Sequence, residues 1–184
     1  MRHDQRLKCL FFISLTILSC RNSTNPVKNE VTYFNLTDYI ENESKRLSAQ
    51  SRVNKTVFLN GREESKFMPV SSWDNELSAF KDADISKKSM LGKYEVDSIE
   101  QGNALLIKYS TIQEKFRTKE LTVLYDENNR PVRINAIVAT NNALYSSRQN
   151  LLYEPEYGYS ISGSQNIRFL EPDSFSIKAR FDKF

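Results

Sequence analysis

The 184-residue sequence has little of the chemistry that most enzymes use, with one histidine and two cysteines. The histidine, His3, and one of the cysteines, Cys9, both lie close to the N-terminus. If that end is removed on maturation, no imidazole base, Ser-His-Asp triad or Cys-His pair can form. Zinc sites draw mainly on Cys and His, and a disulfide needs two thiols. We therefore expect a protein that is not an enzyme and has neither a metal site nor a cofactor.

The sequence also lacks an apolar run long enough to cross a membrane, which takes roughly 20 residues. The N-terminal apolar run covers only residues 9–19, and it follows the basic residues Arg2, Arg6 and Lys8. A basic segment, a short apolar segment and a small residue are typical of a secretory signal peptide. This stretch ends in Ser19 and Cys20, so we expect cleavage there.

The four residues Ile17 to Cys20 resemble the lipobox of bacterial lipoprotein signals. This resemblance implies a signal peptide over 1–19, a lipid on Cys20, and a lipidated flexible tether over 20–30. The alternative is ordinary secretory cleavage nearby, which would leave Cys20 as a free thiol. A lone thiol in an oxidising compartment is unusual, so lipidation is the preferred interpretation.

Removal of the signal also changes the charge. The whole chain has 26 basic and 23 acidic residues, and residues 1–19 contain three and one of these, which leaves 23 and 22. A net charge of +1 without a basic cluster gives no sign of nucleic-acid binding. We therefore expect contact with the membrane through the lipid on Cys20, an envelope protein as a partner, and no nucleic acid.

The body begins with helix and hairpin signals. Asn35 is a good N-cap, and the apolar spacing after it predicts a helix over 36–49. Asn60-Gly61 between two apolar runs predicts a tight hairpin. A second helix is expected to start at Ser71 or Ser72, with an apolar stripe formed by Trp73, Leu77 and Phe80.

From Lys93 onward the apolar period changes to two. Tyr94 and Val96 alternate with acidic residues, and Ile134, Ala136 and Val138 alternate with polar ones. Short polar turns between such runs favour an antiparallel meander of about seven strands. We expect a single α+β domain over 31–184, in which two helices and the hairpin pack on a curled meander. A half-barrel is one form that such a sheet can take.

The features of this body resemble small envelope lipoproteins of the Bacteroidetes type. The resemblance is carried by the Leu59-Asn60-Gly61 hairpin, the helix with Trp73, Leu77 and Phe80, and the strand-rich C-terminal half. It implies a location but no activity. Because Arg21, not Asp, follows Cys20, the analogy favours the outer membrane, facing the periplasm.

Several motifs have a composition found in metal or catalytic sites. Asp82, Asp84 and Ser86 have the opening spacing of a calcium loop, but Lys87 and Lys93 stand where that loop needs Gly and Glu. A helix-terminal loop with solvated charges is therefore preferred. The adjacent carboxylates are expected to belong to turns. They are Glu63 with Glu64, Asp126 with Glu127, and Glu154 with Glu156.

The late part of the chain combines tyrosines with arginines, a composition found in binding surfaces and also on ordinary antiparallel strands. The structural interpretation is preferred. The residues are Tyr145, Tyr153, Tyr157, Tyr159, Arg148 and Arg168.

Three functions remain open at this level. The first is a membrane-anchored envelope lipoprotein that acts as a non-enzymatic binding or scaffolding module. The second is a carrier of a lipid or small apolar ligand, held in a cavity of the curled sheet. The third, a carboxylate-dependent hydrolase, would need two acidic residues that face each other across a cleft.

Overall fold

The computed structural model describes residues 32–59 and 61–181. The predicted signal peptide, the tether and Cys20 lie outside these described residues.

The first helix, α1 (Leu36–Arg46), begins as the sequence predicts. The Asn35 side chain caps it by accepting a hydrogen bond from the Asp38 N–H at 3.0 Å. Phe34 and Tyr39 pack together with ring centroids 5.5 Å apart, which is the contact of a hydrophobic staple. A 3₁₀ turn, η1 (Leu47–Ala49), completes the predicted helix.

The second predicted helix is divided in two. Ser72 caps α2 (Trp73–Glu76), and after Leu77 the chain continues as α3 (Ser78–Asp82). A second 3₁₀ turn, η2 (Lys88–Met90), follows. The expected apolar stripe is buried despite the break. No helix within the described ranges is long and apolar enough to span a membrane.

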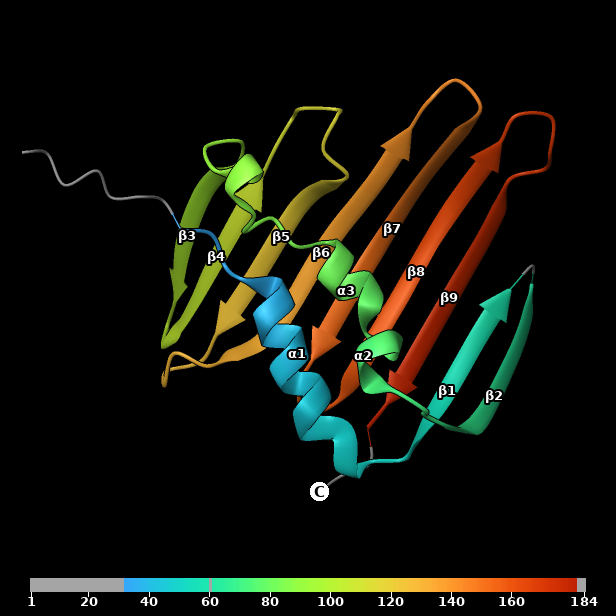
Figure 1. The fold of residues 1–184 in the computed structure, drawn as a ribbon, viewed down its shortest axis with the longest axis horizontal. Helices are drawn as coiled ribbons and strands as arrows, with labels where there is room; N and C mark the ends of the chain where they lie inside the picture. Colours follow the sequence, from blue (N-terminus) through green and yellow to red (C-terminus); the bar gives the residue numbers. More distant parts are fainter. Residues whose placement is uncertain (1–31, 60, 182–184) are drawn as a thin grey trace, which may run out of the picture. The chain divides into compact units, whose positions relative to one another are not determined.

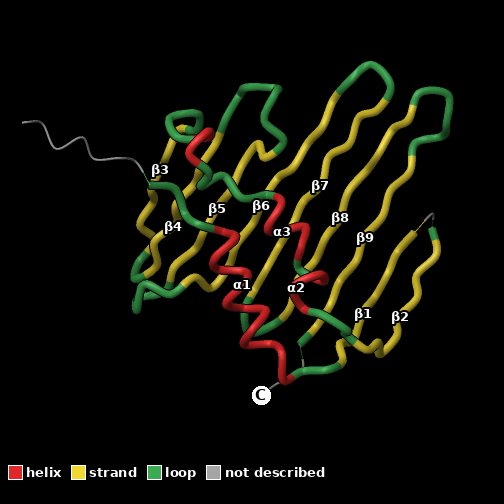
Figure 2. Tube along the Cα trace, viewed as in Figure 1, coloured by secondary structure: helices red, strands yellow, loops and turns green. Residues whose placement is uncertain are grey.

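All strands of the described residues join one antiparallel sheet of nine, in the order β2-β1-β9-β8-β7-β6-β5-β4-β3 (Figures 1 and 2). The strands β3 to β9 confirm the antiparallel meander that the alternation predicts. The nine strands are β1 (Arg52–Leu59), β2 (Arg62–Pro69), β3 (Glu95–Gln101), β4 (Ala104–Ser110), β5 (Thr118–Tyr125), β6 (Pro131–Asn141), β7 (Tyr145–Glu154), β8 (Gly158–Ile167) and β9 (Asp173–Arg180).

Two parts of the predicted architecture are wrong. The hairpin does not cover the meander: β1 pairs with β9, with Val57 opposite Ile177, and extends the sheet from seven strands to nine. The sheet is also open and does not curl into a half-barrel, and β2 and β3 form its two edges (Figure 1). Pairing with β1 satisfies the backbone groups along the outer side of β9, which a hairpin lying over the sheet would leave free.

The two faces of the sheet differ in composition. The helices lie on one of them, which we call the helix-side face (Figure 1). A single row of paired residues on that face is almost wholly apolar: Val57, Ile177, Ile161, Leu151, Ala136, Leu121 and Tyr109. The neighbouring row on the other face, which we call the open face, is mostly polar: Thr56, Lys178, Ser160, Leu152, Asn135, Thr122 and Lys108. One buried face per strand is the arrangement expected of an antiparallel sheet covered on one side.

Aromatic side chains join the helices to the sheet. Phe80 of α3 meets Tyr153 of β7 edge-to-face, with ring centroids 5.7 Å apart. Trp73 of α2 meets Phe181 in the same way at 5.5 Å. These contacts fix the helices against the sheet and thereby position the surface that lies between α1 and α2.

Candidate functional site

A polar cleft of about 480 Å³ lies between α1 with its following turn and the segment that leads into α2. We call it the α1–α2 cleft. Five serines, a glutamine and three charged side chains line it, together with Val70 and Trp73. Its volume falls within the range of small-molecule sites, roughly 300–1,000 Å³. The polar lining residues are Glu41, Ser44, Lys45, Ser48, Gln50, Ser51, Ser71, Ser72 and Asp74.

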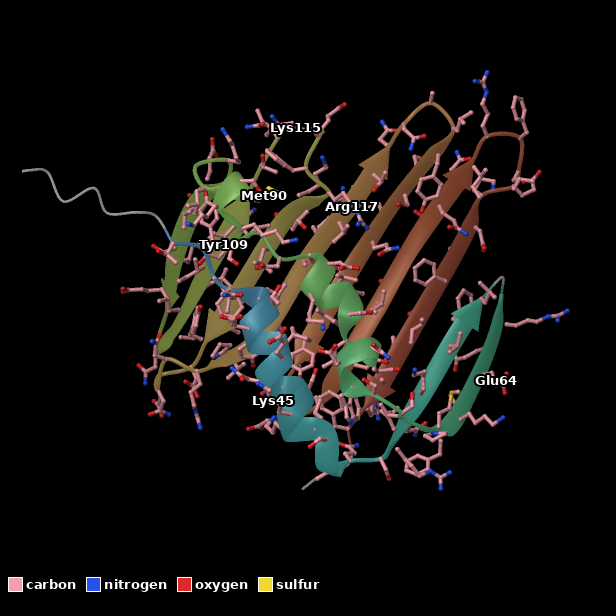
Figure 3. All side chains as sticks on the ribbon, viewed as in Figure 1. Lys45, Glu64, Met90, Tyr109, Lys115 and Arg117 are labelled. Atoms are coloured by element: carbon pink, nitrogen blue, oxygen red, sulfur yellow. The ribbon has the colours of Figure 1, made fainter. Side chains whose placement is uncertain are left out.

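Helical spacing builds one wall of the cleft. Glu41, Ser44, Lys45 and Ser48 follow each other at intervals of three, one and three residues, which places them on one face of a helix. Figure 3 shows Lys45 on this helix. The wall is therefore a stripe of α1 and its terminal turn.

Two hydrogen bonds fix the inner end of the cleft. The Trp73 indole Nε1–H donates to the Gln50 carbonyl oxygen at 2.7 Å, so the start of α2 is tied to the end of the α1 segment. The Gln50 side-chain Nε2 donates to the Arg52 carbonyl oxygen at 3.1 Å. This second bond sets the orientation of the amide, because its nitrogen must face Arg52 and its oxygen must point elsewhere.

Two polar atoms of the cleft are buried without a partner. Of the three such side-chain atoms within the described residues, Ser44 Oγ and Gln50 Oε1 both belong to the lining. The residues are only 8% and 9% exposed. An unsatisfied buried polar group costs about 1–3 kcal/mol, and most native structures contain few of them. A bound molecule with hydrogen-bonding groups would supply the partners that both atoms lack.

The charges at the cleft are mixed. Glu41 and Asp74 contribute two carboxylates and Lys45 one ammonium group. Asp74 is already paired with Lys81 at 2.6 Å. With Asp74 neutralised in this way, Glu41 and Lys45 contribute one charge of each sign. The Gln50 oxygen can only accept, so a ligand must donate to it.

Two tyrosine–carboxylate contacts lie under the helices. The Tyr153 hydroxyl donates to Glu43 at 2.7 Å, and Glu43 also accepts from Arg46 at 2.7 Å. Burial and the neighbouring carboxylate raise the pKa of Tyr153 well above its usual value. The phenol therefore stays protonated and acts as a donor rather than as a base.

The second contact has the same form. The Tyr159 hydroxyl donates to Glu76 of α2, and Lys55 of β1 lies 2.5 Å from the same carboxylate. Burial and the Glu76 carboxylate raise the pKa of Tyr159 well above its usual value. Both contacts fasten helices to strands.

The structure does not bring the late tyrosines and arginines together. Tyr153 and Tyr159 pair across β7 and β8 and are buried on the helix-side face, whereas Tyr157 lies exposed in the turn between these strands. Arg148 lines a hollow of about 380 Å³ on the open face. Arg168 lies over the ring of Phe169, in the β8–β9 loop. These residues form no single surface, and the structural interpretation holds for the buried pair.

The calcium-like motif serves a structural purpose. Asp84 follows α3 in a loop, as predicted, but it is buried rather than solvated. Its carboxylate accepts from the Leu36 N–H at 3.1 Å and from the Ser86 hydroxyl at 2.8 Å. It thus holds the start of α1. Within the described residues no group of three or more His, Cys, Asp or Glu side chains could hold a metal ion.

The adjacent carboxylates also have local functions. Asp126 accepts two hydrogen bonds from the Arg130 guanidinium, and hydrogen bonds from the Arg130 backbone and side chain lower the pKa of Asp126. Glu154 pairs with Arg133 at 2.8 Å. Glu63 and Glu64, by contrast, lie within β2 rather than in a turn.

The sequence contains one sign of the cleft, which is a polar residue at an otherwise apolar position of α1. Leu36, Ile40 and Leu47 mark the buried stripe of α1, and Ser44 falls on the same stripe, four residues after Ile40. A serine in place of an aliphatic residue at such a position is the signal that could have found the site.

No protein-family model, curated protein or solved structure matches this chain.

Proposed function

We propose that this protein is a lipid-anchored envelope module that binds a small, uncharged, hydroxyl-rich molecule such as a sugar in the α1–α2 cleft. The observation that carries the proposal is the convergence of two unpartnered buried groups, Ser44 Oγ and Gln50 Oε1, on one cleft. The module performs no reaction. It holds its ligand at the membrane surface, with Cys20 as the point of anchorage at the outer membrane, facing the periplasm.

The ligand class follows from the hydrogen-bonding groups. Gln50 Oε1 requires a donor, and Ser44 can donate or accept. A hydroxyl group meets both needs, because it offers one proton and two lone pairs. The serines around the rim provide further groups of the same kind. A phosphate or carboxylate would present only acceptors to Gln50, so anions are disfavoured.

This lining supports a polar ligand rather than a lipid. Among the described residues, Val70 and Trp73 are the only apolar side chains that line the α1–α2 cleft, and Trp73 is itself nearly buried. An apolar ligand would desolvate the serines and the charged groups without replacing their hydrogen bonds to water. The carrier of an apolar ligand is therefore the weaker of the two proposals.

The binding proposal is tested with the full chain, extracted from membranes in mild detergent. Glucose and N-acetylglucosamine serve as neutral probes and glucose 6-phosphate as the anionic one, with binding followed by saturation-transfer NMR. We expect the neutral sugars to bind and the phosphate to bind more weakly. Ser44→Ala should weaken sugar binding about tenfold, the equivalent of one hydrogen bond of about 1.4 kcal/mol.

Ser176→Ala is the matched control, because Ser176 lies on the open face, in register with Ser162 of β8. It should leave binding unchanged. Absence of binding by either neutral sugar, or equal binding by the wild-type and Ser44→Ala proteins, would contradict the proposal. Anchorage is tested separately by the mass of the mature N-terminus: an acylated Cys20 supports it, and an unmodified one does not.

A further inference from the structure

The edge strand β2 is the most exposed element of the sheet. Every residue from Arg62 to Pro69 is exposed, and within the described residues β1 is the only strand that pairs with it. Figure 3 shows Glu64 on this outer strand, at the far side of β1 from the helices. An exposed edge presents unpaired N–H and C=O groups that can pair with another chain.

The register shows which backbone groups are free. Val70 donates its N–H to the Ser51 carbonyl at 2.8 Å, and the pairing of Leu59 with Arg62 continues the same register. Because hydrogen-bonded pairs alternate along antiparallel strands, the even-numbered residues of β2 bond to β1. Glu63, Ser65 and Phe67 therefore direct their backbone groups outward. Pro69, which has no N–H to offer, ends this outward row, as is typical of an edge strand.

The charges on β2 lack partners of opposite sign. Glu64 and Lys66 both lie on the helix-side face, opposite Val57 and Lys55. Lys55 is engaged by Glu76 at 2.5 Å, so Lys66 faces a cation of its own sign across the strand pair. Among the described residues, neither Glu64 nor Lys66 forms a salt bridge.

We propose that β2 pairs antiparallel with β2 of a second copy of this chain, with Ser65 of each copy opposite the other. In this register Glu64 of each copy lies directly opposite Lys66 of the other, which supplies both missing partners. Glu63 of each copy exchanges backbone hydrogen bonds with Phe67 of the other. In this register even-numbered residues of β2, which lie on the helix-side face, are opposite even-numbered residues of the second copy. The helices of both copies therefore lie on the same face of a continuous sheet. The contact is two-fold symmetric and therefore closes as a dimer.

The apolar residues of the edge fit the same arrangement. Phe67 and Met68 are 44% and 38% exposed. In the proposed register they lie opposite Glu63 and Arg62 of the second copy, whose aliphatic stems would cover part of them. The opposite edge of the sheet differs. Strand β3 carries acidic residues and no basic one, so two β3 edges repel each other.

Charge reversal tests this dimer in the full chain in detergent, with the mass measured by analytical ultracentrifugation. The wild-type protein should have twice the mass of the chain. Glu64→Lys or Lys66→Glu alone places like charges opposite each other and should give monomers. The double variant E64K/K66E restores opposite charges and should restore the dimer, with circular dichroism showing that each variant is folded.

Cysteine crosslinking in membranes tests the register itself. Facing residues of an antiparallel pair have Cα atoms about 5.5 Å apart, which suits a disulfide. Ser65→Cys should therefore form a crosslinked dimer on oxidation, whereas Ser98→Cys, on the β3 edge, should not. A monomeric wild-type protein, single reversals that remain dimeric, open-ended oligomers, or equal crosslinking at both positions would each overturn the proposal.

Discussion

Ser44→Ala should stabilise this protein, although serine-to-alanine changes at buried positions often destabilise. The Ser44 hydroxyl lies on the buried stripe of α1 and has no hydrogen-bond partner in the described part of the chain. It is therefore desolvated on folding without compensation. Alanine removes the polar oxygen and leaves the rest of the side chain in place.

The magnitude has two parts. Relief of an unsatisfied buried hydroxyl is worth about 1 kcal/mol, at the lower end of the usual range. Alanine also has the higher helix propensity, which adds about 0.5 kcal/mol within a helix such as α1. No large cavity term is expected, because serine and alanine differ by a single oxygen atom. The free energy of unfolding should rise by about 1.5 kcal/mol, which corresponds to a Tm increase of about 3–6 °C at this chain length.

Urea denaturation and calorimetry of the full chain, without sugar, measure this change. Ser48→Ala is the control: the Ser48 hydroxyl lines the same cleft but donates to the Lys45 carbonyl at 2.7 Å and is exposed. Its unfolding free energy should change by less than about 0.5 kcal/mol. A loss of about 1 kcal/mol or more in Ser44→Ala would refute the reasoning, because it would mean that the hydroxyl already has a partner.

Three further predictions concern the fold. Gly158→Ala should destabilise by at least about 3 kcal/mol in urea denaturation, because Gly158 has φ +140° and a Cβ would lie 1.9 Å from the Ala179 carbonyl oxygen. Gly102→Ala, at φ +62° with open space around it, should cost only about 1 kcal/mol, and equal losses would contradict the steric argument. Asn35→Ala should cost about 1 kcal/mol through loss of the α1 cap; an unchanged urea midpoint would contradict it. Burial raises the pKa of Tyr94 in the folded protein to about 12 from 10.0. The contribution of the protonated hydroxyl to the free energy of unfolding is therefore complete below pH 10. It is lost toward pH 12 by up to about 1.4 kcal/mol per pH unit. The difference in tyrosinate absorbance between the wild-type protein and Tyr94→Phe should therefore rise steeply together with unfolding, and a gradual rise of that difference in the folded protein would argue against it.

Local signals were sufficient for much of the fold. Asn35 predicted the start of α1, and the Phe34–Tyr39 contact follows from their positions around that cap. Alternation predicted the strands from β3 to β9, because each of them buries one face only. The start of a helix depends on residues that are neighbours in sequence, and a strand is marked by a period of two. Both signals are visible in the sequence without knowledge of contacts between distant residues.

The position of the β1–β2 hairpin could not be predicted in the same way. Its turn is local, but its place beside β9 depends on Val57 meeting Ile177, which is far away in the sequence. The hairpin residues do not alternate cleanly, since Lys55 and Lys66 lie on the helix-side face. The contact of Lys55 with Glu76 explains why Lys55 lies on this face. Lys66 is tolerated on this face because β2 is an edge strand and the Lys66 side chain remains in contact with solvent.

The α1–α2 cleft shows why a binding site of this kind is hard to find by pattern. Its walls come from 41–51 and 70–74, and most of these residues are polar, as the solvated side of any helix or loop would be. What separates Ser44 from Ser48 is burial, which depends on how the segment before α2 packs against α1. That packing is set by the Trp73 indole, which both enters the core and bonds to the Gln50 carbonyl. A core residue therefore creates the cleft, and the same contact that orders the helices leaves Ser44 Oγ and Gln50 Oε1 buried without a hydrogen-bond partner among the described residues.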